Sequence, residues 1–307
     1  MDKWIQIKAT ADCKYLDDMS AVMSMVDNSL MIEDYSDVVK ELDGVYGDLI
    51  DEELLQKDRT ISSVSVFIPE IKNPAESVGF ITSRFETLSI PAKVECIGVS
   101  EEDWADSWKK YYKPIKTGEK LVIVPLWEKY EAGEDEIVVL MDPGMAFGTG
   151  THETTRLCAA LLEKYLKRGD KMLDVGCGSG ILAICASKLG AASCFACDID
   201  PNAVHVAKEN VEINKTENVT VAVSDLLAGT DRIDGGYDIC CANIVADVII
   251  RMAPAIGDYI ADDGVLIVSG IITERADETV SALSDSGWKL ADERRENGWF
   301  AGVLKKA

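Results

Sequence analysis

A short apolar stretch that turns through three glycines into a second apolar run constrains this chain more than any other feature. Residues 172–175 have the composition of a buried strand, Gly176, Gly178 and Gly180 form a tight turn, and residues 181–186 have helical spacing. Because glycine has no Cβ, the backbone N–H groups of such a turn can approach a ligand closely. The spacing is G-x-G-x-G, which differs from the dinucleotide-binding G-x-G-x-x-G. An ordinary strand-to-helix turn could have the same spacing, so the surrounding sequence must decide whether this turn binds a ligand.

Strand and helix patterns alternate along the rest of the chain. The expected strands are 193–198, 219–223, 237–242 and 264–269, the expected helices are 202–214, 247–260 and 273–286, and a terminal strand pair covers 288–294 and 299–305. Repeated βα units predict an α/β, doubly wound, Rossmann-like parallel sheet. Ligands in such sheets bind outside the carboxyl ends of the strands.

The first hundred residues have a different pattern. The expected order is strand, helix, strand, strand, helix, strand, at residues 4–8, 16–30, 31–32, 63–68, 76–88 and 93–99. This order predicts a small α+β, ferredoxin-like domain. It contains no catalytic constellation, so it is a candidate recognition module. The acidic stretch 33–58 within it has little pattern.

A length of 307 residues favours two domains. We expect an α+β domain at 1–100, a linker helix at 101–118 and the larger domain at 119–307. The linker has an acidic first turn, a basic last turn and an aromatic face. That face either packs on the next domain or forms part of a substrate groove. Two further strands are expected near 120–124 and 137–141.

The net charge of −23 limits the choice of partners. Such a surface repels phosphate backbones, so direct nucleic-acid binding is not expected. It suits a basic partner protein, although acidity can also serve solubility alone. The chain has no apolar run long enough for a membrane span and no signal-peptide pattern at its start. We expect a cytoplasmic monomer.

Cysteine usage fits the same compartment. The nine cysteines lie within predicted strands and helices, as expected for reduced thiols. Cys194 and Cys197 have the C-x-x-C spacing of zinc ligands, but no second pair follows at finger spacing. Their place in a predicted buried strand favours core residues, as it does for Cys240 and Cys241, and no metal site is expected.

Polar residues follow successive strands of the predicted sheet. Asp198 ends the second strand about twenty residues after the glycine turn, where an acid can bind both hydroxyls of a ribose. Asp225 follows the third strand, near the place of an adenine amino group, and Asn243 ends the fourth. Each has an alternative interpretation as a helix cap or turn residue. Together, and without a phosphate-binding G-x-x-x-x-G-K-[ST] loop, they match a site for S-adenosylmethionine.

A glycine-containing loop, residues 142–155, enters the helix expected at 154–166. The hydroxyls of Thr151, Thr154 and Thr155 could simply cap that helix. Phe147 lies among glycines, which is unusual for a core aromatic residue, and this favours a mobile loop that closes over a ligand. His152 is either a structural loop residue or a proton acceptor or substrate contact.

Residues 173–180 resemble the first motif of class I methyltransferases. With segments 142–155, 198–201 and 242–246, the chain is similar to the methyltransferases of ribosomal protein L-eleven (PrmA family). The resemblance is strong from 101 to 307 and weaker before that. The acidic stretch 33–58 departs from it.

The resemblance implies an S-adenosylmethionine-dependent protein-lysine N-methyltransferase. Its reaction is methylation of lysine side chains and of the N-terminal amine of that basic ribosomal protein, which the N-terminal module recognises. Phe147 and residues 148–150 are implied to lie over the cofactor. The expected catalytic residues are Asn243, Phe147 and His152, and the expected cofactor-binding residues are Thr155, Gly176, Gly178, Gly180, Asp198, Asp225 and Asn243.

Other functions remain open at this point. Methyltransferases that act on nucleic-acid bases often follow the asparagine with an aromatic platform, which the sequence after Asn243 lacks. An N-methyltransferase of another protein or of a small-molecule amine is the main alternative. A non-enzymatic module that retains the fold is a further one, and a cofactor-binding test separates it from the enzymes.

Overall fold

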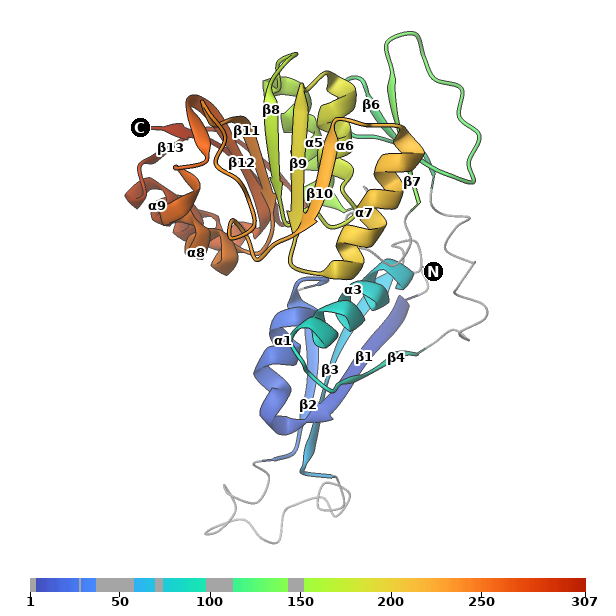
Figure 1. Cartoon of the computed structure of the whole chain (residues 1–307). Helices are drawn as coiled ribbons and strands as arrows, with labels where there is room; N and C mark the ends of the chain where they lie inside the picture. The colour runs from blue at the N-terminus through green and yellow to red at the C-terminus, as the bar shows by residue number, and fades with distance from the viewer. Residues whose placement is uncertain (1–3, 28, 37–57, 70–73, 98–112, 143–151) are drawn as a thin grey trace, which may run out of the picture. The chain divides into compact units, whose positions relative to one another are not determined.

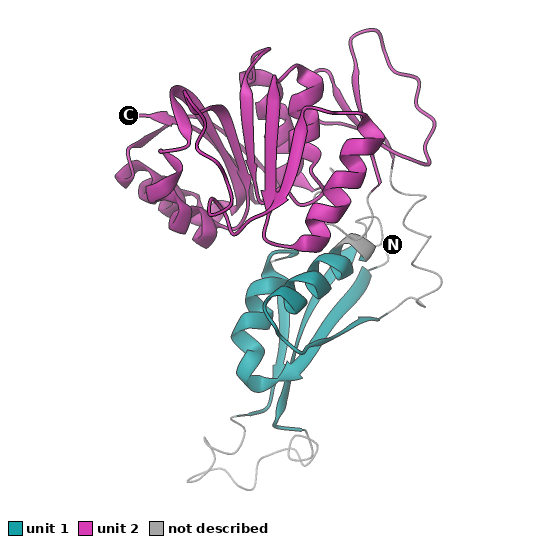
Figure 2. Ribbon diagram, viewed as in Figure 1, with its two compact units in different colours: residues 1–112 teal, residues 113–307 magenta. Residues whose placement is uncertain are grey.

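The computed structural model describes residues 4–27, 29–36, 58–69, 74–97, 113–142 and 152–307. The chain divides into two compact units, residues 1–112 and residues 113–307 (Figure 2). Within the described residues, no helix has both the length and the apolar character needed to cross a membrane.

Among its described residues, the first unit contains a four-stranded antiparallel sheet with the strand order β2-β3-β1-β4 (Figure 1). This order confirms the predicted small α+β domain. The helix expected at 16–30 is shorter than predicted, because the chain turns after Ser24 and begins β2 at Leu30. The elements are β1 (Trp4–Asp12), η1 (Cys13–Tyr15), α1 (Leu16–Ser24), β2 (Leu30–Asp34), β3 (Ile61–Pro69), α3 (Pro74–Thr87) and β4 (Lys93–Ile97).

Alternation along β1 builds the core of this unit. Ile5, Ile7 and Ala9 are fully buried, and the residues between them are more exposed. Helices α1 and α3 cover one face of the sheet (Figure 1) and bury Met19 and Ile81. The hydrophobic face therefore faces the two helices.

The second unit contains the predicted doubly wound sheet. Its seven strands have the order β10-β9-β8-β11-β12-β14-β13. The first five are parallel, β14 is antiparallel to β12, and β13 is antiparallel to β14. The strands are β8 (Lys171–Val175), β9 (Ser193–Asp198), β10 (Val219–Val223), β11 (Tyr237–Asn243), β12 (Ile260–Ile272), β13 (Trp288–Glu296) and β14 (Trp299–Lys306).

Two hydrophobic cores lie on opposite faces of this sheet. Along β11, Ile239 and Cys241 belong to one core, and Cys240 and Ala242 to the other, as the two-residue period of a strand requires. The first core includes residues of α5 (Glu153–Tyr165), α6 (Ile181–Leu189) and α7 (Pro201–Asn214). The second includes residues of α8 (Ala246–Ile256) and α9 (Ala276–Asp285). Helix α8 ends four residues earlier than expected, because Ile260 already begins β12.

A separate three-stranded sheet precedes α5. It contains β5 (Ile115–Lys116), β6 (Leu121–Pro125) and β7 (Ile137–Met141), with β6 and β7 parallel. The described end of the expected linker helix, residues 113–118, is not helical, and that part of the prediction is wrong. Ile115 pairs with Ile123 instead, after Pro114, which cannot donate a helical hydrogen bond. The rest of the expected linker helix lies outside the described residues.

Glu163 on α5 binds the turn between β5 and β6. Its carboxylate accepts the backbone N–H groups of Glu119, Lys120 and Leu121 at 3.1, 2.8 and 3.2 Å. We expect Glu163→Ala to lower the free energy of unfolding by about 1–3 kcal/mol, because three donors lose a charged acceptor. Denaturant unfolding of the full chain measures this. Lys164→Ala, on the neighbouring exposed position, is the comparison, and an equal loss in both variants would contradict the assignment.

The interpretation of Cys194 and Cys197 as core residues is confirmed. Both lie in β9 with at most 2% of their surface exposed. Burial raises the pKa of Cys194 to about 12 and that of Cys197 to about 11. Cys240 and Cys241 are fully buried in β11. These thiols therefore stay protonated at neutral pH.

Candidate functional site

The glycine turn joins β8 to α6 and is bonded to the end of β9. The N–H groups of Gly176 and Cys177 both donate to the Cys197 carbonyl, at 2.8 and 2.9 Å. Gly176 has φ +73° and Gly180, the residue before α6, has φ +78°. A Cβ on Gly180 would lie 3.0 Å from the Cβ of Ala207 on α7. Glycine is therefore required here by both backbone conformation and close helix packing.

Asp198 lies at the carboxyl end of β9, directly beside this turn. Its Oδ2 accepts the N–H of Gly178 at 2.9 Å, and its Oδ1 accepts the N–H of Asp200 at 3.0 Å. The residue is only 4% exposed. A carboxylate has about four lone-pair positions, so each oxygen can accept a further hydrogen bond from a ligand.

Three buried oxygens near this edge have no hydrogen-bond partner within the described part of the chain. They are Thr155 Oγ1, Asp174 Oδ1 and Asn243 Oδ1. Buried polar atoms are normally paired, because an unpaired one costs about 1–3 kcal/mol. Bound ligand groups would satisfy oxygens left in this way.

The three residues come from neighbouring elements. Asp174 in β8 lies opposite Cys241 in β11, two residues before Asn243 ends that strand. Asn243 is paired with Ser269 of β12. Burial raises the pKa of the Cys158 thiol and the neighbouring Ser269 opposes this, and Thr155 lies one helical turn before Cys158 on α5. The first turn of α5 therefore lies over the carboxyl ends of β11 and β12.

Burial raises the pKa of Asp174 to about 7, with a further contribution from Asp198, although the Ala183 N–H bond to Oδ2 opposes this. The folded state thus holds a proton that the unfolded chain releases near its ordinary pKa of about 3.9. The stability from this group is complete below about pH 4 and is lost as the pH rises through 7.

We therefore expect the unfolding free energy of the wild type to fall with pH across this window more steeply than that of Asp174→Asn. The difference in slope is at most about 1.4 kcal/mol per pH unit, which is one proton. Denaturant unfolding at a series of pH values between 4 and 8 measures it. Parallel curves for the two proteins would show that Asp174 is ionised in the folded state throughout.

Two residues predicted from the sequence, His152 and Asp225, do not belong to the group of buried, unpartnered oxygens. His152 is the N-cap of α5: its Nδ1 accepts the Thr154 N–H at 3.3 Å, and its ring meets Trp299 edge-on with centroids 4.8 Å apart. These contacts give His152 a structural role at the start of α5. Its catalytic role stays a prediction. Asp225 is exposed, with Arg251 Nη2 at 3.9 Å from its Oδ1. Phe147 lies outside the described residues.

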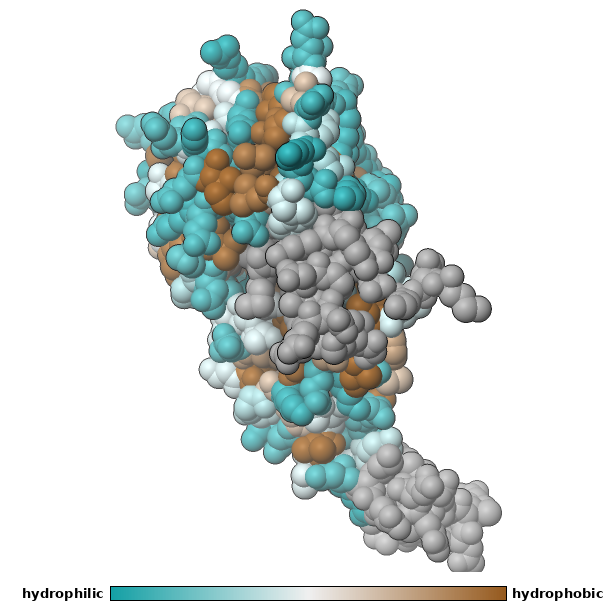
Figure 3. Space-filling model, turned by 90° about the vertical axis from the view of Figure 1, so that its right-hand side faces the viewer, coloured by the Kyte–Doolittle hydropathy of each residue, from teal (hydrophilic) through white to brown (hydrophobic). Residues whose placement is uncertain are grey.

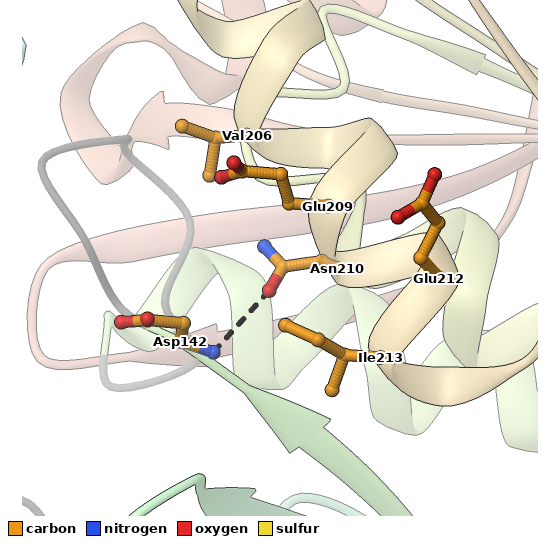
Figure 4. Close-up of a pocket in the computed structure, with 6 residues that line it drawn as sticks. All are labelled: Asp142, Val206, Glu209, Asn210, Glu212 and Ile213. Carbon is orange, nitrogen blue, oxygen red and sulfur yellow. Dashed lines mark hydrogen bonds between the residues drawn. The ribbon is translucent and has the colours of Figure 1, made fainter.

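Asn210 on α7 was not identified from the sequence. Its Nδ2 donates to the Ser179 carbonyl in the glycine turn at 3.1 Å, and its Oδ1 accepts the Asp142 N–H at 3.2 Å. Figure 4 shows the bond between Asn210 and Asp142 at the wall of a pocket, whose volume is about 330 Å³. The sequence signal that indicates it is an asparagine at the helical spacing of the apolar residues Ala203 and Ala207, and the structure buries this side chain fully. The pocket is lined by Asp142, Val206, Glu209, Asn210, Glu212 and Ile213.

Comparison with known proteins identifies close relatives along the whole chain. The family model described as ribosomal protein L11 methyltransferase (PrmA) matches residues 3–307. Ribosomal protein L11 methyltransferase of Caldanaerobacter subterraneus subsp. tengcongensis is 39% identical over 311 residues, 99% of both chains. That of Acetivibrio thermocellus is 40% identical over 312 residues, covering 99% of this chain and 98% of the relative. The crystal structure of ribosomal protein L11 methylase from Lactobacillus delbrueckii subsp. bulgaricus matches with a TM-score of 0.60 and 33% identity, over 64% of this chain and 99% of that one.

Proposed function

The chain belongs to the ribosomal protein L11 methyltransferase family, and from this we propose that it methylates lysine side chains and the N-terminal amine of ribosomal protein L11, with S-adenosylmethionine as donor. The observation that carries the proposal is the group of buried, unpartnered oxygens of Thr155, Asp174 and Asn243. They come from the first turn of α5 and from the carboxyl-terminal parts of β8 and β11, and the glycine turn follows β8 while Asp198 ends β9 of the same sheet.

The donors and acceptors at this edge fit the proposed cofactor. Asp198 is suited to the two ribose hydroxyls, because each carboxylate oxygen has a lone pair left beside its backbone partner. Gly176 and Gly178 have φ +73° and +52°, which keep the turn tight beside Asp198. The hydroxyl of Thr155 can bond a polar group of the cofactor, and Oδ1 of Asn243 is left for the amine substrate. No phosphate has to be bound, which agrees with the short turn.

The bound cofactor supplies an activated methyl group on a sulfonium. The chain's own residues must position the amine and keep it neutral. A free lysine has a pKa of about 10.4, so deprotonation at pH 7 costs about 4–5 kcal/mol. A buried site beside a cationic group lowers the pKa of that amine. The side-chain oxygen Oδ1 of Asn243 then accepts an N–H of the amine and orients the lone pair of the amine nitrogen.

Charge supports a basic protein as the substrate. The net charge of the chain is −23. Figure 3 shows hydrophilic side chains around separate hydrophobic patches on the described part of this face. A ribosomal protein, which binds RNA, is basic and would be attracted to such a surface. The first unit, which has no candidate site of its own among the described residues, is proposed to recognise that substrate in the cytoplasm.

Competition between amines tests the substrate class. The full chain is incubated with S-adenosylmethionine and an equimolar mixture of ribosomal protein L11, a second basic ribosomal protein and free lysine. The proposal predicts methyl groups on L11 peptides, at lysine side chains and at the N-terminus. Preferential methylation of the other protein or of free lysine would move the assignment to another amine substrate.

A further inference from the structure

We propose that the tip of the β13–β14 hairpin, residues 296–299, is a positioning element for the cofactor-binding first turn of α5. The inference rests on the proposed function, because it concerns the helix turn that presents Thr155 to the ligand. Nothing in the order of the sequence suggests it, since the tip lies about 140 residues after the helix start.

Three kinds of contact join the hairpin tip to the helix start. Arg156 Nη2 donates to Glu296 Oε1 at 2.6 Å, and Asn297 Nδ2 donates to Glu153 Oε1 at 3.2 Å. The ring of Trp299 packs against the edge of the His152 ring, the N-cap of the helix. Glu153 is only 5% exposed. A buried carboxylate needs such donors, so the side-chain amide of Asn297 is well placed to fix it.

The hairpin tip is itself held rigidly at the edge of the sheet. Asn297 and Gly298 have φ +48° and +84°, the left-handed pair of a two-residue hairpin turn. The Gly298 carbonyl accepts the Thr273 N–H at 2.8 Å, just beyond the end of β12. The sheet thereby fixes the position of the tip, and the contacts of the tip fix the positions of Glu153 and Arg156.

Thr155 lies between the two helix residues that the hairpin tip binds. A change in the position of Glu153 or Arg156 must therefore move the buried Thr155 hydroxyl relative to Asn243. A displacement of about 1 Å in a site of this kind is sufficient for a large loss of function. The tip residues touch neither the cofactor nor the amine in this scheme, so they are positioning residues.

Helix α5 offers a matched control at its other end. Lys164 Nζ and the Tyr165 hydroxyl both bond Asp292 Oδ2 of β13, at 2.6 and 2.9 Å. This is the same helix, the same strand and the same type of contact, about two and a half helical turns from Thr155. If the hairpin only stabilises α5, removing a contact at either end of the helix should change the ligand affinity by the same amount.

Calorimetric titration with S-adenosylhomocysteine tests the inference in the full chain. Asn297→Gly keeps the left-handed turn and removes only the amide, so it should raise Kd about tenfold, as the loss of the Thr155 hydrogen bond to the ligand predicts. Asn297→Asp suits the turn better than most residues but repels Glu153, and should be worse than Asn297→Gly. Combining it with Glu153→Gln restores a donor and an acceptor and should recover affinity. Asp292→Asn should leave Kd unchanged.

The outcomes separate the inference from the proposed function. Wild-type affinity in Asn297→Gly, or an equal loss in Asp292→Asn, would overturn the positioning role while the proposed function stands. The positioning role would also be overturned if Asn297→Asp bound S-adenosylhomocysteine more tightly than Asn297→Gly, because affinity would then follow turn propensity alone. A wild-type chain that binds no S-adenosylhomocysteine would overturn the proposed function itself. Thermal unfolding midpoints, measured for each variant, identify losses that come from unfolding.

Discussion

Replacing Asn243 with alanine is expected to lower kcat about 100-fold while changing the Kd for S-adenosylmethionine less than about threefold. The reason is that the buried Asn243 Oδ1 has no partner within the described residues and lies at the strand end where the amine is proposed to enter. Its main contribution is then to orient the amine. Single-turnover kinetics with ribosomal protein L11, beside calorimetric titration of the cofactor, measures the two quantities separately.

The matched variant is Asn243→Asp, which keeps an acceptor oxygen of the same shape. A negative charge there stabilises the ammonium form of the incoming lysine and raises its pKa. The rate of this variant should therefore recover as the pH is raised, whereas that of Asn243→Ala should not recover to the same extent. Equal losses of turnover and cofactor affinity in Asn243→Ala would refute the orienting role.

Replacing Asp198 with alanine is expected to weaken cofactor binding more than about 100-fold, because two hydrogen bonds to a charged acceptor are lost together. The same change removes the acceptor of the Gly178 N–H, so the glycine turn loses a link to β9 as well. Calorimetric titration with S-adenosylmethionine measures the affinity. Loss of the hydrogen bonds to the ribose and loss of this link both weaken cofactor binding.

Asp200 provides the comparison for Asp198. It is a second acid in the same loop, 7% exposed, and its side chain caps α7 by accepting the Asn202 N–H at 2.8 Å. Asp200→Ser preserves the cap and should bind the cofactor within about twofold of the wild type. If Asp200→Ser lost as much affinity as Asp198→Ala, the ribose assignment of Asp198 would be wrong.

Regular patterning made most of the second unit predictable. Strands β9 and β10 have the predicted bounds, because each is a short apolar run between turn residues. Helix α1 and the described end of the linker were mispredicted, since apolar spacing continued where the chain turned. The pairing of Ile115 with Ile123 is a short hairpin, and its turn is bound by Glu163 of α5, which lies 42 to 44 residues away in sequence.

The candidate site was only partly predictable for the same reason. The glycine turn and Asp198 follow from strand ends, and the structure brings them into direct contact. The roles of Asp225, His152 and Phe147 stay predictions. Asn210 and the hairpin tip were missed, because their contacts join segments 31 to 144 residues apart in sequence. Asp174 lies within residues 173–180, which resemble the first methyltransferase motif, but its raised pKa depends on burial that only the fold creates.

Intact-protein mass spectrometry of ribosomal protein L11 tests the central claim most directly. Purified L11 is incubated with S-adenosylmethionine and either the wild-type chain or Asp198→Ala. Mass gains in whole methyl units are expected with the wild type, and none are expected with the variant at the same concentration. An unchanged L11 mass, from a wild-type chain shown by titration to bind the cofactor, would contradict the claim that this protein is its substrate.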